Sequence, residues 1–116
     1  VLESNDVNDF IFVKTEYKLQ RIFFDDVLYV KSLGNYLAIK TSKNGKVLTL
    51  MSFKEFEKLI PSSKFVRIHK SYIIPISKIE TINKASVEID GEVIPIGESY
   101  KQFLFNMLKK RGLLGF

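Results

Sequence analysis

Residues 65–75 read FVRIHKSYIIP, and this stretch decides the predicted fold. Its apolar, β-branched residues predict two short strands, one over 65–68 and one over 72–76. Pro75 has no backbone N–H to donate, so the second strand is expected to be an edge strand or to be interrupted there.

The same stretch concentrates polar side chains. If it continues as a strand, Arg67, His69 and Ser71 face one way and Lys70 faces the other. Arg67 and Lys70 can neutralise phosphates, and Ser71 can donate to a phosphate oxygen. Alternatively, Arg67 or His69 stacks against the fold and donates to a backbone carbonyl. We favour this structural role for His69 and a nucleic-acid contact for Lys70.

Strand patterns also dominate the rest of the chain. Eight further short strands are predicted, over 9–15, 19–24, 27–32, 36–41, 46–51, 79–82, 86–89 and 92–96. Asn44-Gly45 and Asp90-Gly91 predict hairpin turns, because these residue types tolerate positive φ. A loop at 33–35 separates two of the strands.

Two segments predict short helices. Ser52 and Glu55 have the spacing of a capping box, and the helix they start ends before Pro61. Ser99 and Gln102 repeat that spacing at the start of a second helix. The apolar stripe of this second helix consists of Tyr100, Phe103, Leu104, Met107 and Leu108. The predicted fold class is therefore mainly β, with about ten short strands and two or three short helices.

Composition limits the function. The 116 residues suffice for one domain, and 46% hydrophobic with 27% charged residues is typical of a packed globule. The absence of cysteine excludes disulfides, thiolate metal sites and a cysteine nucleophile. With His69 as the single histidine and no glycine-rich phosphate loop, we expect no enzyme, no metal and no cofactor. No apolar run approaches the roughly 20 residues that span a bilayer.

The charge is unevenly distributed. The net charge is +5, but Glu3, Asp6 and Asp9 lie in the first ten residues, which contain no basic residue and do not resemble a signal peptide. Residues 11–116 therefore carry 18 basic against 10 acidic side chains, a surplus of 8. Such a surplus predicts a polyanionic partner. On charge alone, a basic surface that only keeps the protein soluble explains the surplus equally well.

The run FVRIHKSYII resembles the central signature of the LytTR-type DNA-binding domain. Three other landmarks follow in the family's order: residues 26–36, the helix region 50–59, and the late motif 94–100. The resemblance covers about residues 9–110. It implies a linker over residues 1–8 and a LytTR-type domain over 9–116.

The resemblance implies a bacterial, cytoplasmic DNA-binding domain that controls transcription as the output of a two-component response regulator. Its partners would be double-stranded DNA, a receiver domain of the same protein and an upstream sensor kinase, without membrane contact. Loops would enter successive major grooves of a bent duplex. The isolated domain would be a monomer, and two copies would bind paired repeats.

The family's contact positions can be transferred to this sequence. The base contacts that the resemblance implies are Asn35, Tyr36, Lys70 and Glu98. The residue types themselves favour phosphate contacts by Arg67, Ser71, Ser99 and Lys101. Lys43 is a weaker phosphate candidate, because charged residues beside a hairpin turn are usually only solvated. Glu98 departs from the family, which usually has a basic residue there. A glutamate can accept from a cytosine amino group, or it can favour the dipole at the start of the last helix.

Two other classes of function stay open. A small basic β domain can bind single-stranded nucleic acid or RNA, which requires exposed aromatic residues; Tyr36 and then Tyr17 are the best candidates. A protein-interaction module requires an exposed apolar patch instead. Most members of the phenylalanine set are expected in the core: Phe10, Phe12, Phe23, Phe24, Phe53, Phe56 and Phe65.

Overall fold

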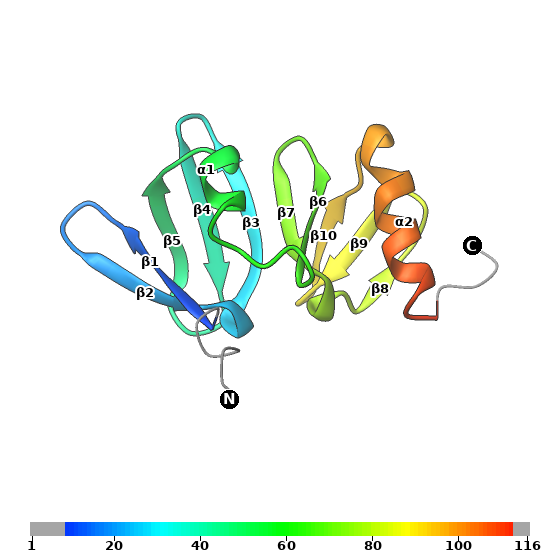
Figure 1. The fold of residues 1–116 in the computed structure, drawn as a ribbon, viewed down its shortest axis with the longest axis horizontal. Coiled ribbons are helices and arrows are strands. Elements are labelled where there is room, and N and C mark those ends of the chain that lie inside the picture. The colour runs from blue at the N-terminus through cyan, green and yellow to red at the C-terminus, as the bar shows by residue number, and fades with distance from the viewer. Residues whose placement is uncertain (1–8, 113–116) are drawn as a thin grey trace.

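The computed structural model describes residues 9–112, which form three antiparallel sheets (Figure 1). The strands are β1 Phe10–Lys14, β2 Leu19–Phe23, β3 Val27–Leu33, β4 Tyr36–Thr41, β5 Gly45–Leu50, β6 Phe65–His69, β7 Tyr72–Pro75, β8 Thr81–Ile82, β9 Ser86–Ile89 and β10 Glu92–Pro95. β1 pairs with β2, the central sheet has the order β5-β4-β3-β7-β6, and the third sheet has the order β10-β9-β8. The mainly β fold predicted from the sequence is confirmed, while the predicted linker over 1–8 lies outside the described residues.

The hairpin of β6 and β7 lies between two hydrophobic cores. Phe65 and Ile73 belong to the first core, together with residues from β1 to β5 and the helix α1 (Phe53–Glu57). Val66, Ile68 and Ile74 belong to the second core, with residues of β9, β10 and the helix α2 (Lys101–Lys109). Alternate residues of β6 therefore join the two halves of the molecule.

Pro75 does not make β7 an edge strand. β7 pairs with both β3 and β6, and it ends at Pro75, where a 3-10 helix over Ile76–Lys78 begins. The second alternative from the sequence, an interrupted strand, is confirmed. The predicted strand over 79–82 is shorter than expected: β8 has two residues, and Ile79 instead caps the 3-10 helix by donating its amide to the Ile76 carbonyl.

The two predicted hairpin turns differ in geometry. Asp90 and Gly91 have φ values of 51° and 78° and form a two-residue turn between β9 and β10, as predicted. The turn between β4 and β5 spans three residues, 42–44, and Gly45 alone has positive φ there, at 64°. The Thr41 hydroxyl holds this longer turn, since it accepts from the Asn44 amide and donates to the Gly45 carbonyl.

Of the two predicted capping boxes, the first forms. The Glu55 amide donates to the Ser52 hydroxyl, and the Ser52 amide donates to the Glu55 carboxylate at 3.0 Å. The Ser52 amide and the Ser52 hydroxyl both donate to the Glu55 carboxylate, and these two hydrogen bonds lower the pKa of Glu55. The second box does not form, because a 3-10 helix (η4, Glu98–Tyr100) precedes α2 and Tyr100 occupies its N-cap without a side-chain bond.

The apolar stripe predicted for α2 is partly wrong. Leu104 is completely buried, with Met107 and Leu108 beside it, but Phe103 is 63% exposed. The buried face is centred on Leu104 and Leu108, which are four residues apart, and Phe103 lies about 100° away around the helix.

A polar contact joins the central sheet to the third sheet. The Tyr29 hydroxyl on β3 donates to the Glu92 carboxylate on β10 at 3.2 Å, and the Lys40 ammonium on β4 lies 3.8 Å from the same carboxylate. Burial, with the negative charge of Glu92, raises the pKa of Tyr29. The phenol therefore stays a donor near neutral pH.

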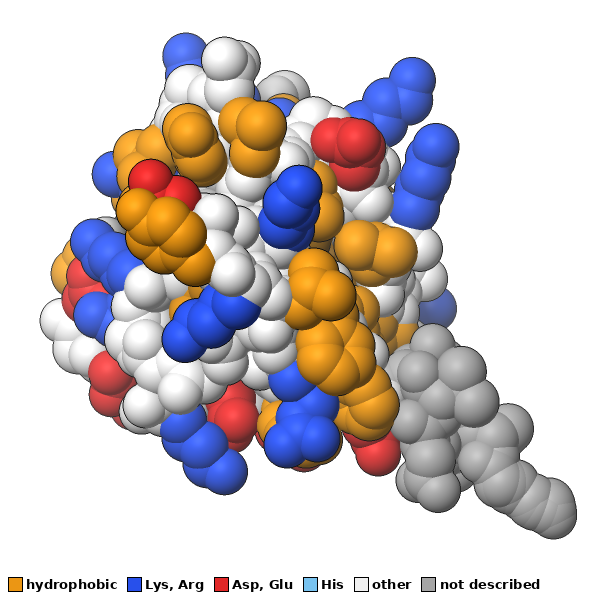
Figure 2. All heavy atoms as spheres, turned by 90° about the vertical axis from the view of Figure 1, so that its left-hand side faces the viewer, with side chains coloured by type: hydrophobic (Ala, Val, Ile, Leu, Met, Phe, Trp, Pro, Cys, Tyr) orange, Lys and Arg blue, Asp and Glu red, His pale blue; other side chains and the backbone are white. Residues whose placement is uncertain are grey.

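Of the seven phenylalanines considered for the core, four are buried, but those on β1 and β2 are not. Phe10, Phe12 and Phe23 are exposed and share the outer face of this hairpin, where the Arg21 guanidinium lies 4.7 Å from the Phe23 ring centre. Figure 2 shows this side of the molecule, on which hydrophobic and basic side chains alternate.

Removing the buried side chain of Ile68 tests the role of β6. Ile68 is 0% exposed, so Ile68→Ala should reduce the free energy of unfolding by about 2–5 kcal/mol. The control Val93→Ala, on a side chain that is 70% exposed, should change it by less than about 0.5 kcal/mol. Urea unfolding followed by circular dichroism measures both, and equal effects would contradict the two-core description.

Candidate nucleic-acid interface

Three polar turns lie along one edge of the molecule, the upper edge in Figure 1. They are the β3–β4 turn at Gly34-Asn35, the β6–β7 turn at Lys70-Ser71, and η4 at the start of α2. β3 and β7 are antiparallel neighbours, and Lys31 pairs with Tyr72 next to both turns. The first two turns must therefore occur at the same end of the central sheet.

Backbone hydrogen bonds connect the middle turn to both sides. The Ser32 amide, next to the first turn, donates to the Ser71 carbonyl at 2.9 Å. The Gly97 amide, next to η4, donates to the Ile68 carbonyl at 2.8 Å. The three turns are thus parts of one hydrogen-bonded edge, although they are far apart in the sequence.

Two of the four predicted base-contacting residues, Asn35 and Tyr36, are exposed at the first turn. Asn35 is exposed at the turn, and its side chain forms no hydrogen bond within residues 9–112. It borders a shallow hollow of about 270 Å³ that Ser52 and Glu55 of the α1 cap also line. Tyr36 is 50% exposed and pairs with Leu50 of β5, which is itself exposed.

The middle turn presents a free cation. Lys70 is exposed, and its ammonium has no carboxylate partner among the described residues. The neighbouring Ser71 is half-buried, and its amide donates to His69 Nδ1 at 3.0 Å. His69 therefore has the structural role predicted for it, but it accepts from a backbone amide and, within residues 9–112, does not donate to a carbonyl as predicted.

The strand alternation expected through this stretch stops before the turn. The register of β6 with β7 shifts between Arg67 and His69, and Lys70 and Ser71 form the two-residue turn. Lys70 and Ser71 therefore do not point to opposite faces of one strand; both lie at the tip of the hairpin.

Arg67 points into the protein rather than away from it. Its Nη2 donates to the Lys70 carbonyl at 2.7 Å and its Nε donates to the His69 carbonyl at 3.3 Å. The guanidinium carbon lies 4.9 Å from the ring centre of Phe53 and 5.7 Å from that of Tyr100. This is the structural alternative that the sequence left open for Arg67.

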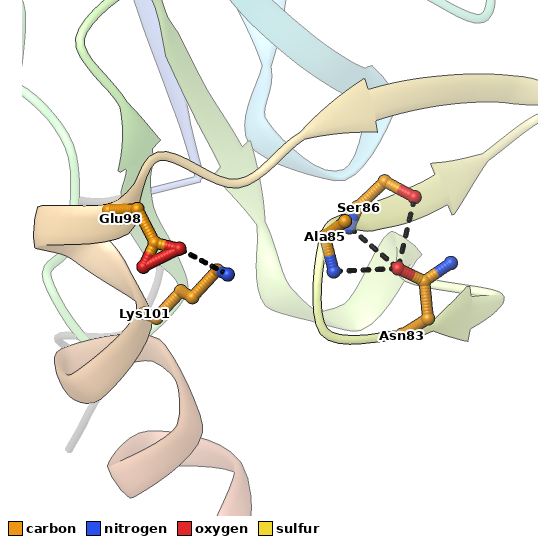
Figure 3. Close-up of polar contacts among 5 residues, drawn as sticks. All are labelled: Asn83, Ala85, Ser86, Glu98 and Lys101. Carbon is orange, nitrogen blue, oxygen red and sulfur yellow. Dashed lines mark hydrogen bonds and ion pairs between the residues drawn. The ribbon is translucent and has the colours of Figure 1, made fainter.

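The third turn holds an ion pair. The Lys101 ammonium lies 2.7 Å from a Glu98 carboxylate oxygen (Figure 3). The Glu98 side chain is 86% exposed and that of Lys101 is 26% exposed. The Glu98 carboxylate offsets the positive charge of Lys101, which is one of the predicted phosphate contacts. Ser99, between the two residues in the sequence, is exposed.

Lys43 is not brought together with the other predicted residues. It lies in the β4–β5 turn, at the opposite end of β4 from Asn35. Its neighbour Ser42 donates its amide to the Asp26 carbonyl in the 3-10 helix Phe24–Asp26, at the lower end of the sheet in Figure 1.

Sequence reasoning missed two features of this edge. It did not pair Arg67 with Phe53 and Tyr100, because these rings come from distant segments that only the folded sheet brings near. It also did not assign Lys31, whose ammonium lies 5.6 Å from the ring centre of Tyr72, beside the middle turn. The sequence shows that Lys31 is basic, but only the pairing of Lys31 with Tyr72 in the folded sheet shows that it lies beside the middle turn.

The fold and the edge define a class: a small, mainly β domain that presents polar and basic turns side by side. The sequence matches the family model of the LytTr DNA-binding domain over residues 17–109, so the chain belongs to this DNA-binding family. Its structure is similar to the LytTr DNA-binding domain of a Bacillus cereus protein described as a methyl-accepting/DNA response regulator. That likeness has a TM-score of 0.76, 24% identity, and coverage of 93% of this chain and 98% of the other.

No protein with curated functional information matches the sequence. No helix among residues 9–112 is both long enough and apolar enough to cross a membrane.

The Glu98–Lys101 pair gives a testable electrostatic prediction. Glu98→Gln removes the carboxylate that holds Lys101, so affinity for duplex DNA of random sequence should rise. If Lys101 then reaches one phosphate, the slope of log K against log salt should steepen by about 0.9.

The matched control is Glu80→Gln, which removes the same charge beside β8, beyond the lower end of β7. Fluorescence anisotropy at four salt concentrations measures both slopes. Equal slopes for the two variants would show that the pair lies away from the DNA.

Proposed function

We propose that this domain binds specific sequences of double-stranded DNA and controls transcription as the output domain of a bacterial two-component response regulator. The observation that carries the proposal is the row of three turns, joined by backbone hydrogen bonds and each exposing a polar side chain. Rigidly spaced side chains can test several base edges at once, which is what sequence readout requires.

The order of the turns suggests how the duplex lies. The β3–β4 turn, the β6–β7 turn and η4 follow one another along the longest dimension of the molecule (Figure 1). A duplex along this edge would meet the turns successively, and bending it would let separate turns enter successive major grooves. Bending also adds readout of DNA shape.

Each exposed residue has a chemistry that suits a particular contact. The Asn35 amide can make a two-point contact to adenine, with Tyr36 beside it, and Lys70 can contact guanine or a phosphate. Glu98 can accept from a cytosine amino group. The Ser71 and Ser99 hydroxyls can donate to phosphate oxygens, and Lys101 can do so when it leaves Glu98.

The remaining partners are also part of the proposal. A receiver domain of the same protein, phosphorylated through a sensor kinase, would regulate binding in the bacterial cytoplasm. The described domain would be a monomer alone, and two copies would occupy paired repeats. Pairing would add the binding energies of two small interfaces on one DNA.

The exposed β1–β2 face supports the two alternatives. Its phenylalanines could stack on single-stranded bases or bind another protein. However, the Arg21 guanidinium lies over the rings of Phe10 and Phe23, at 5.9 Å and 4.7 Å from their centres, and so occupies part of the stacking surface. On the polar edge, Asn35 and Lys70 need no such rearrangement, because neither side chain has a partner among the described residues.

Selection of bound duplexes from a random pool tests the proposal. Enrichment of one motif, particularly in two spaced copies, is the expected result. Binding without enrichment would contradict sequence specificity, and competition by single-stranded DNA would favour the first alternative. No binding at low salt by folded protein would favour protein interaction.

Two substitutions test the assigned edge. Lys70→Ala and Asn35→Ala each remove an exposed side chain and should weaken binding to the selected motif by roughly 5- to 150-fold, equivalent to about 1–3 kcal/mol. Both variants should unfold at the wild-type temperature, because neither side chain is packed.

Matched controls exist at the opposite ends of the same strands. Lys64→Ala changes an exposed lysine just before β6, and Asn44→Ala changes an exposed asparagine just after β4. Anisotropy titrations with the selected motif should show near wild-type affinity for both controls. If the controls weaken binding as much as Lys70→Ala and Asn35→Ala, the duplex does not lie on the proposed edge.

A further inference from the structure

The middle turn lacks the residues that usually stabilise a two-residue hairpin turn. Common turns of this length need positive φ, which glycine, asparagine or aspartate supplies. Lys70 and Ser71 occupy the turn, and neither has positive φ. Other contacts therefore hold the turn: the Ser71 carbonyl accepts from the Ser32 amide, and the side chains of Arg67 and His69 form hydrogen bonds within the hairpin.

Arg67 makes the more extensive of these contacts. Its guanidinium donates to two successive carbonyls, those of His69 and Lys70, and so closes the turn from its inner side. The Lys70 carbonyl belongs to the same residue whose ammonium is exposed. A planar group that bonds this carbonyl restricts the backbone from which the Lys70 side chain extends.

The same guanidinium also links the neighbouring elements. Phe53 belongs to α1, whose cap residues line the hollow beside Asn35, and Tyr100 belongs to η4, which carries Glu98. Gly97 leaves room for the Tyr100 ring, because a Cβ there would lie 3.1 Å from Tyr100 Cδ2. Arg67 thus contacts the middle turn, η4 and the helix α1 beside the first turn, without being the residue exposed at any of the three turns.

We propose that Arg67 is a positioning residue for DNA recognition, which acts by fixing Lys70 relative to the Asn35 and Glu98 turns. The inference rests on the proposed function, because its consequence is discrimination between DNA sequences. Arg67 uses two of its five N–H donors in this role, so a direct phosphate contact through the others is the competing explanation.

The variant Arg67→Lys separates the two explanations. It keeps the charge but cannot bond both carbonyls in the same fork geometry. A positioning role predicts that affinity for the selected motif falls about fivefold or more, while affinity for random duplex and its salt slope stay unchanged. A phosphate contact predicts nearly wild-type affinity for Arg67→Lys, and for Arg67→Gln a salt slope smaller by about 0.9 on both duplexes.

A double-mutant cycle tests whether Arg67 acts through Lys70. In the Lys70→Ala background, Arg67→Lys should cause no further loss of affinity for the motif, because the side chain being positioned is gone. The same fold loss in both backgrounds would overturn the inference.

Hydrogen exchange of the free protein gives a readout that needs no DNA. Arg67→Lys should speed exchange of the Ser71 amide, while the Ile39 amide in the buried middle of β4 should exchange at the wild-type rate. Unchanged Ser71 exchange would overturn the inference. If Arg67→Lys does not fold, Tyr100→Leu, which removes one ring and keeps Arg67, must show the same loss of discrimination.

Different results would contradict the proposed function and the role of Arg67. Wild-type protein that binds the motif and random duplex equally would overturn the proposed function and this inference together. Wild-type protein that discriminates, with an Arg67→Lys variant that discriminates equally well, would overturn the inference alone.

Discussion

Burial on both faces of the β6–β7 hairpin is the constraint on which the rest of this structure depends. Phe65 and Ile73 fill the first core, and Val66, Ile68 and Ile74 fill the second. A strand that is apolar on both faces cannot shift by one residue without exchanging the two sets of side chains, so its register is fixed. The tip of the hairpin is consequently fixed in relation to both halves of the molecule.

That fixed tip explains why three turns from distant segments can act as one surface. The Ser71 carbonyl accepts from Ser32 on one side, and the Ile68 carbonyl accepts from Gly97 on the other. The polar side chains at the edge are therefore preorganised, and binding does not have to bear the cost of ordering three independent loops. The Glu98–Lys101 pair distinguishes this edge electrostatically, because it neutralises the third turn while leaving Lys70 free in the second.

Local signals in the sequence predicted much of this fold. The Asp90-Gly91 turn and the Ser52 capping box depend on neighbouring residues only, and both form. The exposure of Phe103 and the surroundings of Arg67 depend on how distant elements pack, and here the sequence was insufficient. Hydrophobic periodicity does not say which side of α2 meets the core, and no spacing indicates that Phe53 and Tyr100 flank one guanidinium.

In the proposed binding mode, one duplex contacts all three turns simultaneously. Amide chemical shifts recorded during titration with the selected duplex test this arrangement. The largest changes should fall in residues 34–36, 70–71 and 98–101, follow one apparent Kd, and leave the 42–44 turn unaffected. Changes centred on the β1–β2 hairpin, or confined to one of the three turns, would contradict it.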